Sequence, residues 1–570
     1  MSEPNNPHHH PAGPDPVAPA HHYAGSTPTT GAEPEPEENP LPPFDTSLPS
    51  CSSTLSSSSS SSTKKEKPST ATTTAAITTP TTPESSIAPG SDHTTTAISE
   101  GEDAVIIDPK AEKSLRRKFD RTLMVLVFCS YLLAFLDRSN IGNAEAAGMS
   151  EELGFGDDKF QWLLTIFYIP YIVFEVLAVM WKLVPPHIWA GPMVLIWGLA
   201  STLQATAHNW EGLMACRWIL AMAEAGFAPG VPYLLSFFYR RGELGLRIGI
   251  FFSAAPLATT FAGALAYGIT SGHTAISPWR LLFLVEGAPT LVLAIVLFFY
   301  LPDSPDTAKF LSPGEKEVAR SRAILQSGQE GKARLGSINK KEVIAAFESL
   351  QTVIPALMYF SCNVSFSSLP IFLPSILNSM GFSKIEAQGL TAPPYFLAFL
   401  VCIGTTYLGD RTQQRGVIIM VLSVIGGTGY ILLATNTSLA VRYVGVFLAA
   451  SGVFPAIANI LPWTLNNQGT DTKRGVGIAI LNVIGQCGPL LGTRLFPASA
   501  KPFYFEGMTV CAAFMFFNAL LAAGLRWHFV RKNMALGDAE RMATGSLMVV
   551  SSGRRGDSER EGAVGYRYVL

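Results

Sequence analysis

Charged side chains are scarce in this chain of 570 residues. Asp, Glu, Lys and Arg together make up 15% of the sequence, against about 25% in soluble proteins. Uncharged runs such as 248–270 and 416–441 alternate with short charged clusters, and each run matches the ~20 residues that a helix needs to cross a bilayer. This pattern argues against a soluble enzyme or a nucleic-acid-binding protein and predicts an all-α membrane protein with several spans.

The chain also has little net charge and few cysteines. The formal net charge of −2 averages tails, loops and spans, so it identifies no acidic or basic partner. Six of the seven cysteines fall in apolar runs, where thiols behave as small hydrophobes. Neither a disulfide framework nor metal-ligand spacing is recognisable. The sequence contains no nucleotide-binding loop, zinc-binding helix or hydrolase elbow, so we predict no cofactor, no metal and no enzymatic activity.

Residues 1–118 are rich in Pro, Ser and Thr and lack apolar periodicity. This composition predicts a disordered cytoplasmic tail. His8, His9 and His10 could bind a metal ion, but low-complexity drift is the better interpretation of such a tract. No cleavable signal peptide is expected, because the first apolar segment begins near Thr122.

Twelve apolar stretches follow, and they predict two six-helix bundles. The first bundle is expected at 119–301 and the second at 350–530, with a cytoplasmic linker at 302–349 and a cytoplasmic tail at 531–570. Within the linker, Ser312 to Glu315 has the pattern of a capping box that starts a short helix. The predicted spans are centred on 122–143, 160–180, 188–207, 212–238, 248–270, 280–301, 352–374, 387–408, 416–435, 439–462, 475–496 and 507–526.

The distribution of basic residues predicts the orientation of the spans. Sixteen Lys and Arg residues lie near span ends on one side and six on the other. The positive side is expected to face the cytoplasm, which places both termini there. The glycosylation sequon at Asn436 then falls in an outer loop.

The two halves repeat internally. Three residues of span four recur in span ten at offsets of 225 or 226 positions, namely Arg217 as Arg442, Gly226 as Gly452 and Pro229 as Pro455. Parallel repeats of this kind are typical of transporters whose binding site lies between the halves.

Ionisable residues inside spans are costly and therefore candidates for function. Asp137 lies ~24 Å from the inner surface and Arg217 ~8 Å from the outer one, at ~1.5 Å per helical residue. In a ~30 Å core these depths nearly coincide, so we predict an ion pair between the two. Glu224, two turns from Arg217, should lie near the midplane, where a carboxyl group can alternate between protonated and ionised forms.

Other polar groups in the spans are candidates for substrate binding. Arg138 has no equally obvious carboxylate partner and could attract an anion. Asn363, Tyr395, Asn482 and Gln486 offer uncharged hydrogen-bonding groups in the second half. The alternative for all of these residues is a structural role in pinning helices together, and for Glu175 and Glu286 that alternative is at least as strong.

Two inner loops carry a family resemblance. Gly409-Asp410-Arg411, followed by Arg415-Gly416, resembles the cytoplasmic loop motif of the major facilitator superfamily, in which the acid and the arginines latch neighbouring helix ends. The first-half copy, at 182–187, lacks the Asp. That difference puts the corresponding latch in question.

More specific motifs resemble the anion:cation symporter family of that superfamily, in particular its fungal allantoate-permease-like branch of nicotinate, pantothenate and biotin permeases. They are Leu-Asp-Arg-Ser-Asn-Ile-Gly-Asn at 136–143, Arg217 with Glu-Ala-Gly-Phe at 224–227, Trp-Arg at 279–280 with Glu-Gly at 286–287, and Pro-Asp-Ser-Pro at 302–305. The resemblance implies proton-driven uptake of organic anions by alternating access. It also implies proton coupling at Asp137 and Glu224, and substrate binding or charge balance at Arg138 and Arg217.

We therefore expect a monomeric multi-pass protein of the plasma membrane that carries a small carboxylate with protons, and whose partners include the lipid bilayer but no nucleic acid. An efflux antiporter of a metabolite or drug is the first alternative. Against it, span five carries Ala255-Pro256 where exporters of the superfamily usually have Gly-Pro. A non-transporting nutrient sensor is the second alternative, and the long polar tail permits it without containing an output module.

Overall fold

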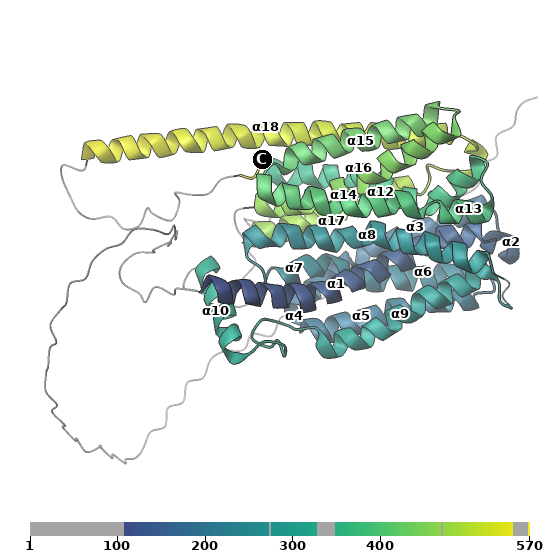
Figure 1. Cartoon of the computed structure of the whole chain (residues 1–570), viewed down its shortest axis with the longest axis horizontal. Helices are drawn as coiled ribbons and strands as arrows, with labels where there is room; N and C mark the ends of the chain where they lie inside the picture. Colours follow the sequence, from purple (N-terminus) through teal and green to yellow (C-terminus); the bar gives the residue numbers. More distant parts are fainter. Residues whose placement is uncertain (1–107, 273–274, 328–347, 469–470, 551–567) are drawn as a thin grey trace, which may run out of the picture. The chain divides into compact units, whose positions relative to one another are not determined.

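The computed structural model describes residues 108–272, 275–327, 348–468, 471–550 and 568–570. In these residues all regular structure is helical, and twelve helices are long and apolar enough to cross a membrane (Figure 1). The twelve spans predicted from the sequence are thereby confirmed.

The first six spans run from α1 to α9. Several contain short 3₁₀ segments, one of which includes Pro and Gly residues that break the helical hydrogen-bond pattern. The elements are α1 (Pro109–Ala146), α3 (Asp157–Phe174) with η1 (Glu175–Val179) and α4 (Met180–Leu183), α5 (Pro186–Leu203) with η2 (Gln204–Thr206), α6 (Trp210–Ala225) with η3 (Ala228–Gly230) and α7 (Val231–Leu235), α8 (Arg241–Thr270) and α9 (Pro278–Tyr300).

The second six spans are more continuous. They are α12 (Leu350–Ser379), α13 (Lys384–Gly389) with α14 (Ala392–Thr412), α15 (Arg415–Thr435), α16 (Leu439–Asn466), α17 (Asp471–Gly492) and α18 (Phe505–Val550). Three short helices of the described part of the chain lie outside the spans, namely α2 (Met149–Leu153), α10 (Pro313–Ser327) and η4 (Ala498–Ala500).

Some boundaries differ from the predicted ones. Helix α1 begins at Pro109, so residues 109–118 are helical, although the sequence places them in the tail. The Asp108 side chain caps this helix by accepting a hydrogen bond of 3.0 Å from the backbone N–H of Lys110. Helix α18 likewise continues to Val550, well beyond the expected end of the bundle. Polar helical ends extend a span past its apolar part, and hydropathy does not detect them.

The capping box predicted in the linker is present at the start of α10. The backbone N–H of Ser312 donates to the Glu315 carboxylate at 2.9 Å, and the backbone N–H of Glu315 donates to the Ser312 hydroxyl at 3.4 Å. The Glu315 carboxylate also pairs with Lys118 of α1 at 2.7 Å. This ion pair and the backbone N–H of Ser312 hold the pKa of Glu315 below its usual range.

Small residues allow the two halves to approach each other closely. A side chain at Gly142 of α1 would meet the backbone of Ile371 in α12, and one at Gly249 of α8 would meet Thr406 in α14. Such contacts substitute for the hydrophobic effect, which does not drive helices together in lipid. We call the end of the bundles beside α10 the linker end and the opposite end, which holds α2 and α13, the loop end (Figure 1).

At the loop end, polar contacts join the halves. The Lys384 ammonium pairs with Glu151 at 3.1 Å, and the backbone N–H of Ala498 donates to the Asp157 carboxylate at 2.9 Å. Deeper in the bundle, the Gln388 amide donates to the carbonyl of Asn143 at 3.3 Å. The halves are therefore closed on each other at this end.

Candidate functional site

Four charged side chains from α1 and α6 form a buried cluster. Asp137 and Arg138 are consecutive in α1, whereas Arg217 and Glu224 lie two turns apart in α6. Asp137 is 0% exposed and Glu224 is 1% exposed. Consecutive helical residues differ by about 100° around the axis, so Asp137 and Arg138 face different neighbours.

Arg138 is the cation that faces Glu224. The Arg138 guanidinium forms an ion pair with the Glu224 carboxylate, and the second oxygen of Glu224 has no hydrogen-bond partner among the described residues. The guanidinium carbon also lies 4.8 Å from the ring centre of Phe167 and 5.1 Å from that of Tyr171. A carboxylate and two aromatic faces thus stabilise a charge that burial alone would make costly.

Asp137 faces away from this pair, toward two hydroxyl groups. Ser201 of α5 donates to Asp137 Oδ1 at 2.7 Å, and Thr290 of α9 donates to Oδ2 at 3.0 Å. The acid Glu286, 1% exposed in α9, lies near Asp137, and its own oxygens have no hydrogen-bond partner among the described residues. Asp137 thus lies near a second buried acid, on a different face of α1 from Arg138.

The predicted ion pair between Asp137 and Arg217 is wrong. Arg217 instead donates from Nη1 to the backbone carbonyl of Arg138 at 3.1 Å. The depth calculation placed the two residues at one level of the bundle, but depth does not fix the rotation of each helix about its axis. For the same reason the sequence offers no obvious carboxylate partner for Arg138, whereas the structure pairs it with Glu224.

A small cavity lies beside the cluster, between the halves. Its charged lining residue is Arg138. The space open to the centre of a water molecule is about 10 Å³, room for about one water. The lining comes from α1 and α3 of the first half and from α12 and α17 of the second, and it includes Phe135, Arg138, Ser139, Tyr168, Asn363, Phe366, Ser367 and Gln486.

The sequence-predicted substrate residues divide into two sets. Arg138 and Asn363 line the cavity, and the Asn363 amide also donates to the carbonyl of Gly485 at 3.1 Å. Arg217 and Tyr395 are not among the lining residues. Tyr395 lies one layer behind, with its ring centre 5.5 Å from that of Phe454.

The latch motif at the linker end is assembled in the second half. Asp410 and Arg415 form an ion pair, and Arg415 Nη1 donates to Asn459 of α16 at 3.0 Å. Gly245 of α8, from the first half, packs against both charged groups, and the Asp410 carboxylate accepts a hydrogen bond from the backbone N–H of Leu246. Arg411, the third motif residue, is exposed to the surroundings.

Comparison with known proteins agrees with this architecture. The family model described as Major Facilitator Superfamily matches residues 127–493. The chain belongs to the major facilitator superfamily. The MFS transporter prlL of Fungal sp. (strain NRRL 50135) is 34% identical over 440 residues, which are 75% of this chain and 88% of that protein.

Further relatives of this major facilitator transporter give the same result. The MFS-type transporter efuF of Hormonema carpetanum is 30% identical, with 78% of this chain and 91% of the relative covered. Among solved structures, a D-xylose-proton symporter matches with a TM-score of 0.54 at 14% identity, covering 70% of this chain and 96% of the symporter. The last likeness shows the fold alone, and the relatives' names identify transporters without a shared substrate.

In the first half of this major facilitator transporter, where the loop motif lacks its acid, His187 contacts an acid from another loop. The Asp303 carboxylate, which follows α9, accepts the backbone N–H of His187 at 3.1 Å and contacts the His187 ring nitrogen at 2.8 Å. A carboxylate at the start of α5 also interacts favourably with the helix dipole. The acid beside His187 therefore comes from the segment after α9, whereas the sequence motif would place an acid in the loop at 182–187.

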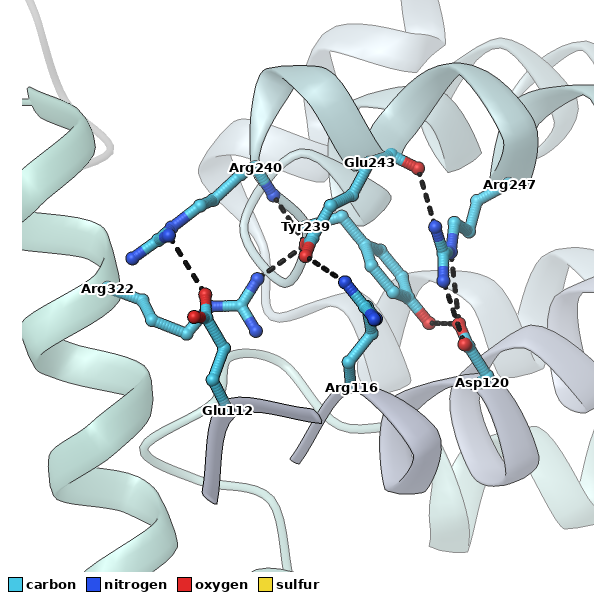
Figure 2. A network of polar contacts seen from close by, with 8 residues as sticks. All are labelled: Glu112, Arg116, Asp120, Tyr239, Arg240, Glu243, Arg247 and Arg322. Carbon is cyan, nitrogen blue, oxygen red and sulfur yellow. Dashed lines mark hydrogen bonds and ion pairs between the residues drawn. The ribbon is translucent and has the colours of Figure 1, made fainter. Parts of the chain in front are cut away.

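A network of charges fixes the linker helix of the transporter to its first half (Figure 2). Arg322 of α10 pairs with Glu243 of α8 and, at 3.5 Å, with Glu112 of α1. Arg116 also pairs with Glu243 at 3.0 Å, and Arg240 pairs with Glu112 at 2.9 Å. Three elements far apart in the sequence are thus joined into one unit at the linker end.

The same network continues along α1 to Asp120. Arg247 pairs with Asp120 at 2.8 Å, and the Tyr239 hydroxyl donates to the same carboxylate at 2.9 Å (Figure 2). Burial and the Asp120 charge raise the pKa of Tyr239, so its hydroxyl remains a hydrogen-bond donor. The sequence identified neither this network nor the Ser201 and Thr290 hydroxyls, because none of these residues belongs to a recognisable local motif.

Asn436 lies in the loop between α15 and α16, and its glycosylation remains a prediction.

Proposed function

We propose that this membrane transporter carries a small organic anion together with protons, by symport. The observation that supports this most strongly is the Arg138–Glu224 ion pair at the wall of the cavity. An arginine can bind a substrate carboxylate through two parallel hydrogen bonds. Arg138 can therefore exchange Glu224 for a bound anion without losing its counter-charge.

Protonation of Glu224 makes this exchange possible. An ionised Glu224 occupies Arg138, and a buried carboxylate that lost its cation would be costly. If Glu224 takes up a proton, it becomes neutral and Arg138 is released to hold the substrate anion. Anion and proton then bind together, and Asn363 and Gln486 supply uncharged hydrogen-bonding groups from the second half.

Asp137 is the second proton site in this proposal. Hydroxyl groups both donate and accept hydrogen bonds, so Ser201 and Thr290 can hold the Asp137 side chain in either protonation state. The acid also lies on a different face of α1 from Arg138, about 100° around the helix axis. Asp137 can therefore change its charge without breaking the hydrogen bonds that hold it or the Arg138–Glu224 ion pair.

We propose the orientation and the membrane location that the sequence predicts. The excess of Lys and Arg on the linker side favours cytoplasmic termini. The motifs shared with the anion:cation symporter family and its fungal allantoate-permease-like branch favour carboxylate uptake at the plasma membrane by a monomer. Because the loop end is closed and the cavity narrow, substrate entry requires the halves to separate on one side.

The test is uptake of labelled organic acids, nicotinate first, in permease-deficient cells at pH 5 and pH 7. We compare the wild type with Glu224→Gln and with Glu211→Gln, a control on the same helix whose side chain is exposed. We expect uptake that is stronger at pH 5, abolished by a protonophore, lost in Glu224→Gln and retained in Glu211→Gln. Lowered internal substrate in wild-type cells would favour the efflux antiporter, and uptake insensitive to pH and to Glu224→Gln would contradict proton coupling.

A further inference from the structure

A short segment, Tyr568–Leu570, lies against the linker end of the second half and is held mainly through its backbone. The Asn533 side chain of α18 accepts from the backbone N–H of Tyr568 at 2.9 Å and donates to its carbonyl at 2.9 Å. The Asn467 side chain, directly after α16, does the same for Val569, at 2.8 Å and 3.1 Å. Each asparagine therefore satisfies both backbone groups of one residue.

The next residue of the segment contacts the latch loop itself. The backbone N–H of Leu570 donates to the carbonyl of Gln413 at 3.2 Å, and the backbone N–H of Gly416 donates to Leu570 at 3.2 Å. Gln413 and Gly416 flank Arg415, the residue that pairs with Asp410. The segment thus binds both sides of the turn that presents the latch arginine.

Side-chain contacts add selectivity to this backbone binding. The Tyr568 ring stacks on Phe529 with a centroid distance of 5.2 Å and an interplanar angle of 6°, and the Lys532 ammonium lies 5.4 Å from the same ring. The Trp463 indole N–H donates to the carbonyl of Val569 at 2.8 Å. The site thus contacts the aromatic ring of Tyr568, whereas it holds Val569 chiefly by hydrogen bonds to its backbone.

We propose that the groove formed by the α14–α15 turn, α16 and α18 is a binding site for the Tyr568–Leu570 segment, and that occupancy of this site stabilises the closed latch. The physical link is direct. Arg415 and Asp410 pack on Gly245 of α8, and Asp410 holds the backbone N–H of Leu246, so the latch joins the two halves. Fixing the turn on both sides of Arg415 opposes the separation of the halves at the linker end. This regulation goes beyond the proposed symport and depends on no particular substrate.

The test is hydrogen exchange of the full-length protein in nanodiscs, followed by mass spectrometry. Two variants remove the segment's contacts, Tyr568→Ala and Asn533→Asp, since an aspartate accepts but does not donate a hydrogen bond. Met534→Ala, at an exposed neighbour of Asn533, is the matched control. Loss of these contacts should speed amide exchange about tenfold in residues 409–420 and about fivefold in residues 243–250 of the other half, with the control unchanged.

A peptide of residues 565–570, Gly-Tyr-Arg-Tyr-Val-Leu, supplies the second measurement. Added to the Tyr568→Ala protein, it should restore protection in both regions, whereas the same peptide with Ala at the position of Tyr568 should not. Unchanged exchange at 409–420 in both variants would overturn the binding site. Faster exchange at 409–420 without any change at 243–250 would overturn the link between occupancy and the latch.

Discussion

The two halves of the molecule share a repeat but differ in charge. Glu224 of α6 corresponds to Ala450 of α16 at the offset of 226 that relates Gly226 to Gly452. Arg217, deep in the first half, corresponds to Arg442, which donates to the carbonyl of Pro502 at 3.1 Å near the loop end. The repeat therefore preserves a glycine and an arginine, whereas the acid Glu224 has no counterpart in the second half.

This difference suggests a division of labour. The first half holds the ion pair and the acids that can exchange protons, and the second half presents amides and aromatic rings to the cavity. The acids that exchange protons and the uncharged amides that contact the substrate then come from different halves.

Breaking the ion pair should have the largest effect on stability. Arg138→Met leaves Glu224 buried without its cation and is expected to lower the free energy of unfolding by about 3–5 kcal/mol. The double variant Arg138→Met with Glu224→Leu should recover most of that loss, because an apolar pair replaces the ions. Both variants should lack uptake. Thermal unfolding in detergent measures the stability, and an Arg138→Met protein as stable as the wild type would show that the pair is not what holds Glu224.

Introducing an acid into the second half at the position that corresponds to Glu224 should destabilise the protein. Ala450→Glu introduces a buried carboxyl group with no arginine placed to receive it, at a cost of about 3 kcal/mol. Ala450→Ser is the milder control. The amount of folded protein, measured by size-exclusion chromatography, should fall for the glutamate variant alone. Normal folding of Ala450→Glu would contradict the view that a buried acid at this depth needs an arginine partner such as Arg138.

Removing the hydroxyls beside Asp137 should have an intermediate effect. Ser201→Ala and Thr290→Val each delete one hydrogen bond to a buried carboxyl group, which is expected to cost about 1–3 kcal/mol of stability. Uptake should fall in both, and it should fall furthest when both changes are combined. Thr202→Val, whose hydroxyl bonds within its own helix, serves as the control. Equal uptake in all these variants would remove Asp137 from the proton path.

Weakening the contact between Asp303 and His187 should have the smallest effect on stability. Asp303→Asn weakens the contact with His187 at a partly exposed site, so a loss of about 0.5–1 kcal/mol is expected. Asp410→Asn, at the buried latch of the second half, should lower the unfolding temperature more. If the order of these two variants were reversed, the first-half contact would be the stronger latch.

Much of the architecture could be predicted from the sequence because it follows from one-dimensional signals. Runs of mainly apolar residues locate all twelve spans, and the Ser312–Glu315 pattern locates the start of α10. The cost of burying charge identified Asp137, Arg138, Arg217 and Glu224 as candidates, and the structure brings them into one region around α1 and α6.

The pairing of these residues could not be predicted in the same way. Depth along a helix follows from residue counting, but the direction of a side chain depends on how each helix is rotated by its neighbours. Asp137 thus meets the Ser201 and Thr290 hydroxyls rather than Arg217. Contacts between distant segments, such as Asp303 with His187 or Tyr568 with Asn533, carry no local pattern at all.

The central claim is that Glu224 takes up a proton when Arg138 binds the anion. The most direct measurement is calorimetry of substrate binding to the purified protein in buffers of different ionisation enthalpy, using the organic acid identified by the uptake assay. The account predicts that the wild type takes up about one proton per anion bound and that Glu224→Gln takes up none. Anion binding without proton uptake in the wild type, or with equal uptake in Glu224→Gln, would contradict it.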